Sequence, residues 1–119
     1  MQLSQIQQLF ARDVVKLLQY IEEEGFFFTF GETYRTLDQA EIYAKEGKGI
    51  ENSLHCKRLA IDINLFNEKC EFLSSTKDHA HFGKYWESLH PANRWGGNFV
   101  GKNGLPKPDG NHYERRNTI

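Results

Sequence analysis

The chain has 119 residues, of which 39% are hydrophobic and 13% aromatic, with 15 basic and 16 acidic side chains. This length and composition predict one globular domain, residues 1–119, and argue against disorder. The net charge is −1 and both signs are mixed along the chain. Because no basic stripe is present, we expect no nucleic-acid partner.

Neither membrane insertion nor export through a signal peptide is expected. The N-terminus lacks the basic region followed by an apolar run that is typical of a signal peptide. No stretch approaches the roughly 18–20 apolar residues of a membrane span. The two cysteines, Cys56 and Cys70, are too few for a disulfide framework, so reduced thiols are expected.

The N-terminal third predicts a helix, a strand and a second helix. Apolar residues at three- and four-residue steps indicate an amphipathic helix over residues 3–23, with Ser4 and Gln7 as its capping box. The apolar run 26–30 favours a strand whose phenylalanines lie in the core. Thr36 is expected to cap a helix over residues 37–45, which ends at Gly47.

A loop over residues 48–57 leads into the clearest strand pattern of the chain, residues 59–65. Strict alternation places one set of side chains in the core and a second set on the opposite face. The core set is Leu59, Ile61, Ile63 and Leu65, and the opposite set is Ala60, Asp62 and Asn64.

The C-terminal half predicts a hairpin, a helix and a final strand. Residues 67–69 form the hairpin turn and 70–73 the returning strand, followed by a helix over 77–89 capped by Ser75 or Thr76. Residues 95–110 are rich in glycine, asparagine and proline and predict a loop, and 111–114 predict a short strand. The predicted helices and strands do not alternate one for one along the chain. The expected class is α+β, a small antiparallel sheet with helices packed on one side.

Two histidines and an aspartate supply the ligands of a catalytic zinc site. His55 precedes Asp62 by seven residues, and His112 lies near the C-terminus. Because seven is odd, a regular strand would point His55 to the wrong side, so we place it in a loop that folds back over the sheet. Two imidazoles and one carboxylate suit one Zn²⁺ and leave a position for water. Calcium and magnesium prefer oxygen ligands.

A zinc hydrolase also needs a proton acceptor and a cation. Asp109, three residues before His112, is the predicted general base and then acid, with Glu114 as the alternative or as a partner of the ligands. Arg35 is the predicted group for a substrate carboxylate or the oxyanion. Ser53 is either a substrate contact or a local cap. We reject thiol catalysis by Cys56 because adjacent residues in an extended loop diverge from each other.

At these residues the chain resembles the zinc D-alanyl-D-alanine carboxypeptidases of the VanY type and the phage L-alanyl-D-glutamate endopeptidases. The family signature runs Ser-x-His-x-x-Gly-x-Ala-x-Asp and then Asp or Glu-x-x-His. The matching residues are Ser53, His55, Ala60 and Asp62, followed by Asp109 and His112. Thr33–Thr36 resembles the segment whose arginine contacts substrate, and Trp95–Gly97 resembles the tryptophan–glycine segment. Arg58 departs from the family, which usually has glycine at that place.

The resemblance implies a Hedgehog/DD-peptidase-like fold and a single zinc peptidase domain without a separate wall-binding domain. It implies hydrolysis of a bond in bacterial peptidoglycan stem peptides, L-alanyl-D-glutamate first, by a monomeric phage endolysin. Such an enzyme is made in the host cytoplasm and then released to the cell wall. Two alternatives stay open: a D-alanyl-D-alanine carboxypeptidase or dipeptidase, and a non-catalytic zinc-stabilised binding module.

Overall fold

The computed structural model describes residues 1–47 and 53–118. The first part of the predicted loop, residues 48–52, therefore lies outside the described residues. The elements follow in the order α1 (Leu3–Glu23), β1 (Phe27–Phe30), α2 (Leu37–Lys45), the 3₁₀ helix η1 (Leu54–Lys57), β2 (Ala60–Phe66), β3 (Phe72–Leu73), α3 (Thr76–Leu89), β4 (Asn93–Trp95), the 3₁₀ helix η2 (Gly96–Asn98) and β5 (His112–Arg115).

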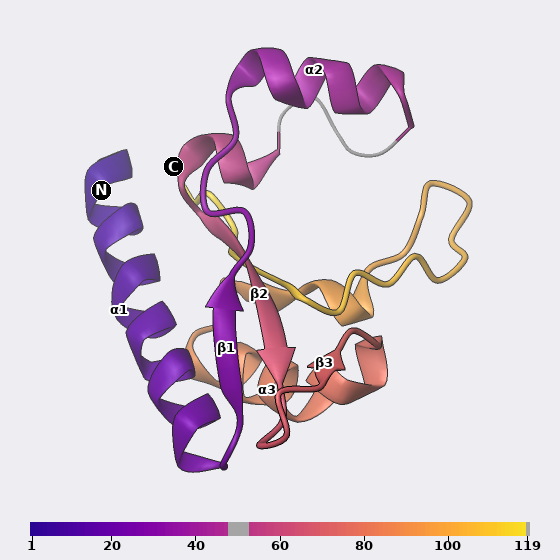
Figure 1. Cartoon of the computed structure of the whole chain (residues 1–119). Helices are drawn as coiled ribbons and strands as arrows, with labels where there is room; N and C mark the ends of the chain where they lie inside the picture. The colour runs from indigo at the N-terminus through magenta and orange to yellow at the C-terminus, as the bar shows by residue number, and fades with distance from the viewer. Residues whose placement is uncertain (48–52, 119) are drawn as a thin grey trace.

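The strands form one antiparallel sheet in which β2 is central. The order is β1-β2-β5-β4, and the short β3 pairs with the end of β2. Helices α1 and α3 pack against each other and share the hydrophobic core with the sheet, while α2 lies beyond the far end of β1 (Figure 1). The α+β prediction, an antiparallel sheet with helices on one side, is confirmed.

Strand β2 has the predicted alternation. Its core set is 0–6% exposed and packs against apolar residues of α1 and α3, among them Phe10, Leu17, Phe82 and Trp86. Asp62 and Asn64 are only partly buried on the opposite face. One face of the sheet therefore anchors the fold, and the other is available for polar side chains.

The two capping predictions for α2 and α3 are confirmed. The Thr36 side chain accepts a hydrogen bond from the Gln39 N–H at 3.0 Å, and Ser75 accepts one from Asp78 at 3.1 Å. Gly47 follows α2 with a φ of +75°, a left-handed conformation that costs glycine little.

Other sequence predictions were wrong in detail. Helix α1 spans the predicted residues Leu3–Glu23, but Gln2 is its N-cap, and the Gln5 side chain, instead of Ser4 and Gln7, completes its capping box. Phe27 and Phe30 are 54% and 58% exposed because β1 is an edge strand, so they are not core residues. The short strand β4, which follows the turn after α3, was not predicted from the sequence.

A buried ion pair ties α1 to the end of the sheet. Arg115 of β5 places Nη1 3.2 Å from the Asp13 carboxylate, and the Asn93 amide donates to the same carboxylate oxygen at 3.0 Å. Asp13 and Arg115 are 6% and 5% exposed. Because removal of one partner leaves the other charge buried without compensation, this pair is sensitive to single substitutions.

Asp13→Ala is therefore expected to lower the free energy of unfolding by about 3–5 kcal/mol. Urea titration followed by circular dichroism measures the loss. Glu22→Ala, at an exposed position of the same helix, is the control and should change stability by less than about 0.5 kcal/mol. A loss below about 1 kcal/mol in Asp13→Ala would show that the pair contributes little.

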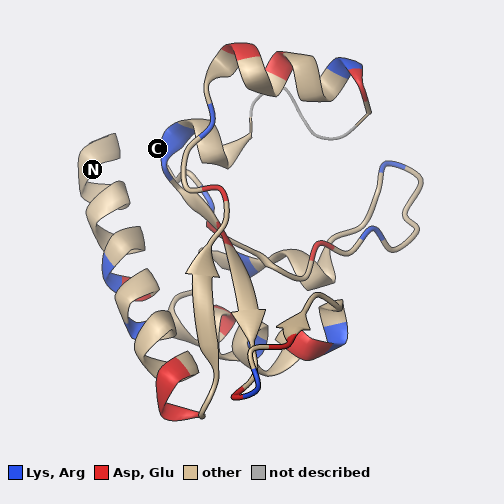
Figure 2. Cartoon of the chain, in the orientation of Figure 1, with Lys and Arg blue, Asp and Glu red and all other residues tan. Residues whose placement is uncertain are grey.

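Charged residues are interspersed over the helices and loops, with acidic and basic positions close together along α1 and α2 (Figure 2). Among the described helices, none has the length and apolar character needed to span a membrane.

Candidate metal centre

The pairing of β2 with β5 brings Asp62 and His112 face to face. The two residues are direct partners in the antiparallel register. Their backbone N–H groups bond elsewhere: Asp62 donates to the Glu32 carbonyl at 2.9 Å and His112 to the Asp109 carbonyl at 3.1 Å. Asp62 and His112 thus form a pair without hydrogen bonds between them, the type in which side chains of neighbouring strands lie closest.

His55 reaches the same place from η1, as the odd spacing predicted. Ser53 caps this short helix, and its hydroxyl accepts a hydrogen bond from the His55 N–H at 3.2 Å. Arg58 follows the helix as its C-cap and has a φ of +56° and a ψ of +37°. This left-handed conformation explains why glycine suits the position. Arg58 adopts it with its guanidinium 4.1 Å from the centre of the Tyr34 ring.

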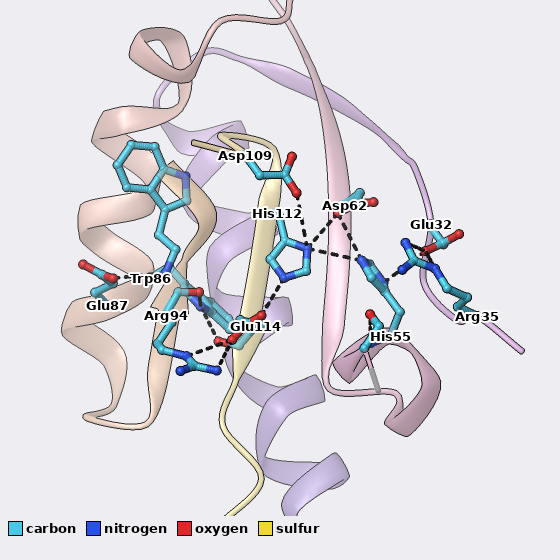
Figure 3. Close-up of polar contacts among 12 residues, drawn as sticks. Glu32, Arg35, His55, Asp62, Trp86, Glu87, Arg94, Asp109, His112 and Glu114 are labelled. Atoms are coloured by element: carbon cyan, nitrogen blue, oxygen red, sulfur yellow. Dashed lines mark hydrogen bonds and ion pairs between the residues drawn. The ribbon is translucent and has the colours of Figure 1, made fainter. Parts of the chain in front are cut away.

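The three predicted ligands direct one atom each at a common centre (Figure 3). His55 Nε2 lies 3.2 Å from His112 Nδ1 and 3.3 Å from Asp62 Oδ1, and His112 Nδ1 lies 3.2 Å from Asp62 Oδ1. A tetrahedral ion with bonds of about 2.0–2.1 Å requires ligand atoms about 3.3–3.4 Å apart. The triangle of donor atoms therefore has nearly the size that such an ion requires, and this group could hold a metal ion.

The electrostatics of the group are those of a strongly coupled cluster. Burial alone would raise the pKa of Asp62, but hydrogen bonds from His112 and His55 outweigh it and lower that pKa to about 2. Burial alone would lower the pKa of His112, but bonds to Asp62 and Glu114 raise it to about 9. Because these partners favour the charged imidazolium, a metal ion that binds through His112 Nδ1 competes with a proton for that atom.

Glu114 lies behind His112, on the side away from the donor atoms (Figure 3). Its Oε1 accepts from His112 Nε2 at 2.7 Å, and its Oε2 accepts from Arg94 Nε at 2.8 Å. This bond holds the proton on Nε2 and leaves Nδ1 free to act as a ligand. Of the two roles considered for Glu114, the geometry favours the partner of a ligand, because the side chain is only 8% exposed and lies behind His112, away from the donor atoms (Figure 3).

The tryptophan–glycine segment positions Asp109. Gly96 accepts the Asp109 N–H at 2.8 Å, and a Cβ on Gly96 would lie 2.2 Å from the Asp109 carbonyl oxygen. The indole N–H of Trp95 donates to the Gly110 carbonyl at 2.7 Å. Trp95 is thus a packing residue of this loop. With the loop held by these contacts, Asp109 Oδ2 lies 3.9 Å from His112 Nδ1.

The Asp109 side chain is 57% exposed, so solvent and substrate can reach it. Burial raises its pKa, and Asp62 adds to that effect, while the positive charges of His112 and Arg35 oppose it. A carboxyl group with a raised pKa at the edge of a cluster is suited to accept and return a proton.

Arg35 lies on the other side of the cluster and is paired with Glu32, a residue that the sequence reasoning missed. Arg35 Nε donates to Glu32 Oε1 at 2.7 Å, and Nη2 lies 2.5 Å from the same oxygen. The guanidinium also lies 4.9 Å from the centre of the Tyr43 ring. These contacts hold Arg35 beside His55. The positive charge of Arg35 acts to lower the pKa of Asp109.

Other reactive side chains point away from this centre. Cys56 Sγ faces the Thr36 carbonyl at 3.7 Å, as expected for a residue adjacent to His55 that diverges from it. His79 bonds to the Tyr113 hydroxyl at 2.8 Å, and His81 to Glu24 at 2.6 Å. The two histidines of α3 thus have separate partners.

The fold is similar to that in the crystal structure of the Serratia marcescens L-Ala D-Glu endopeptidase ChiX. The TM-score is 0.67 at 15% sequence identity, over 88% of this chain and 79% of that one. At this identity the likeness establishes the fold. No family model matches the chain, and no curated protein matches it.

Proposed function

We propose that this chain is a zinc-dependent peptidoglycan peptidase, one peptidase domain that hydrolyses the L-alanyl-D-glutamate bond of bacterial stem peptides. The observation that carries the proposal is the triangle of donor atoms from His55, Asp62 and His112, with the Asp109 carboxylate beside it. The fold that the chain shares with an L-Ala D-Glu endopeptidase supports the choice of substrate class.

In this proposal His55 Nε2, Asp62 Oδ1 and His112 Nδ1 hold the ion. A bound zinc ion supplies an acidified water molecule and a Lewis acid for the scissile carbonyl. Asp109 takes the proton of the attacking water and returns it to the leaving amine, which its exposure and raised pKa favour.

Arg35 is the proposed group for the substrate carboxylate. The D-glutamate residue lies on the leaving side of the bond and carries one free carboxylate there, and a planar guanidinium binds such a group in bidentate fashion. Ser53 is 5% exposed, and its hydroxyl engages the His55 N–H. We assign it the positioning of His55, and a direct contact with substrate stays a prediction.

Digestion of purified sacculi tests the proposal. With zinc present, mass spectrometry should detect released peptides that begin with glutamate, and a chelator should abolish their release until zinc is restored. Release of free D-alanine alone would favour the carboxypeptidase alternative. Zinc binding and zinc-dependent stability without any cleavage would favour the non-catalytic module.

A further inference from the structure

Glu32 lies where the candidate ligands and the candidate substrate arginine meet. Its backbone follows β1 and is held by the sheet, since the Glu32 carbonyl accepts the Asp62 N–H at 2.9 Å and the neighbouring Gly31 N–H donates to the Asp62 carbonyl at 2.8 Å. The side chain then extends between His55 and Arg35 (Figure 3). Its placement is therefore fixed by the same strand that carries a ligand.

His55 has one ring nitrogen without an acceptor. Its Nε2 faces the donor triangle, so a metal ion bound there leaves the ring proton on Nδ1. Among the described residues, Nδ1 of this 2% exposed side chain has no hydrogen-bond partner. Glu32 Oε1 lies 3.7 Å from it. A shift of about 1 Å brings that oxygen to hydrogen-bond distance.

The other histidine of the cluster already has such a partner. His112 bonds through Nε2 to Glu114 at 2.7 Å, on the side away from the donor atoms. A histidine that binds a metal generally donates its second N–H to a carboxylate, carbonyl or water, which orients the ring and increases its basicity. Glu32 is placed to do for His55 what Glu114 does for His112.

The same Glu32 oxygen also accepts both contacts from Arg35. The Glu32 carboxylate thus lies between the His55 imidazole, which faces the donor triangle, and the Arg35 guanidinium, whose positive charge acts on Asp109. We infer that Glu32 is a positioning residue with two tasks. Its carboxylate accepts a hydrogen bond from the His55 Nδ1–H when the metal ion is bound, and it holds Arg35 in place to bind the substrate carboxylate. The second task rests on the proposed function, and the first requires only that a metal ion binds.

Zinc affinity, measured by competition with a chelating indicator, tests the first task. Glu32→Ala is expected to weaken binding about 10–100-fold. Glu32→Gln should weaken it less, because the amide oxygen of glutamine can still accept a hydrogen bond from the His55 Nδ1–H. Glu41→Ala removes an exposed carboxylate that pairs with Lys45 on α2, and this control should bind zinc as the unchanged protein does.

Wild-type zinc affinity in a folded Glu32→Ala protein would overturn this task. If that variant does not fold, Glu32→Gln decides: a measurable loss of less than about tenfold supports the task, because a neutral oxygen is a weaker acceptor than a carboxylate, and affinity equal to that of the unchanged protein contradicts it. Both readings use binding alone, so they hold even if the chain cleaves no peptide.

Steady-state kinetics test the second task. For a peptide with glutamate after the scissile bond, Glu32→Ala should raise KM about tenfold more than for the same peptide with glutamine there, because a misplaced Arg35 loses the carboxylate contact. Equal changes in KM for the two peptides would contradict a role through Arg35. Absence of cleavage by the unchanged protein would reject the proposed function and leave the zinc result standing.

Discussion

Alanine in place of Asp109 is expected to preserve zinc binding and to reduce the rate of peptide hydrolysis by about 10²–10⁴-fold. The carboxylate lies 3.9 Å from His112 Nδ1 and takes no part in the donor triangle, so its removal leaves the three ligand atoms in place. What is lost is the group that accepts and returns a proton. Rates on a defined stem peptide, together with zinc content from elemental analysis, measure both effects.

Glu68→Ala is the control for Asp109→Ala, since it removes an exposed carboxylate from the hairpin turn after β2. It should leave both the rate and the zinc content unchanged. Near-normal hydrolysis by Asp109→Ala would refute the assignment of the general base. Loss of zinc from that variant would instead place Asp109 among the ligands.

His112→Ala is expected to lose the metal ion and the activity together. Its Nδ1 is one corner of the donor triangle, and the substitution leaves two ligands where three converged. Because loss of a partner behind a ligand already costs about 10–100-fold in affinity, loss of the ligand itself should cost more than about 100-fold. Equilibrium zinc titration and hydrolysis rates measure the two losses.

The matched control is His81→Ala. His81 is also a histidine bonded to a carboxylate, Glu24, but its side chain is 59% exposed on α3 and lies outside the triangle. This variant should keep zinc and activity. Circular dichroism of both variants separates loss of a ligand from loss of the fold. Stoichiometric zinc in a folded His112→Ala protein would contradict the proposed ligand set.

Local patterns were sufficient to predict much of the framework. The bounds of α2 follow from a capping threonine and a terminal glycine, and the two faces of β2 follow from strict alternation. The same alternation placed Asp62 on the open face, and the odd spacing placed His55 in a turn that folds back. The three candidate ligands could therefore be named from the residues, and the structure brings their donor atoms together.

What the sequence did not reveal depends on contacts between distant segments. Strand β4 has three residues beside two glycines, too short for any periodicity to be visible. Phe27 and Phe30 are apolar but lie on an edge strand, where only one neighbour covers them. Glu32 has no motif of its own, and its relation to His55, 23 positions later in the chain, is visible only once η1 folds back over the sheet.

The most direct test is X-ray absorption spectroscopy of the protein loaded with one equivalent of zinc. The expected result is a first shell of nitrogen and oxygen at about 2.0–2.2 Å, with two imidazole rings and no sulfur. A sulfur contribution at about 2.3 Å, which would bring in Cys56 beside His55, would contradict the ligand set. Failure to retain stoichiometric zinc would contradict the metal centre itself.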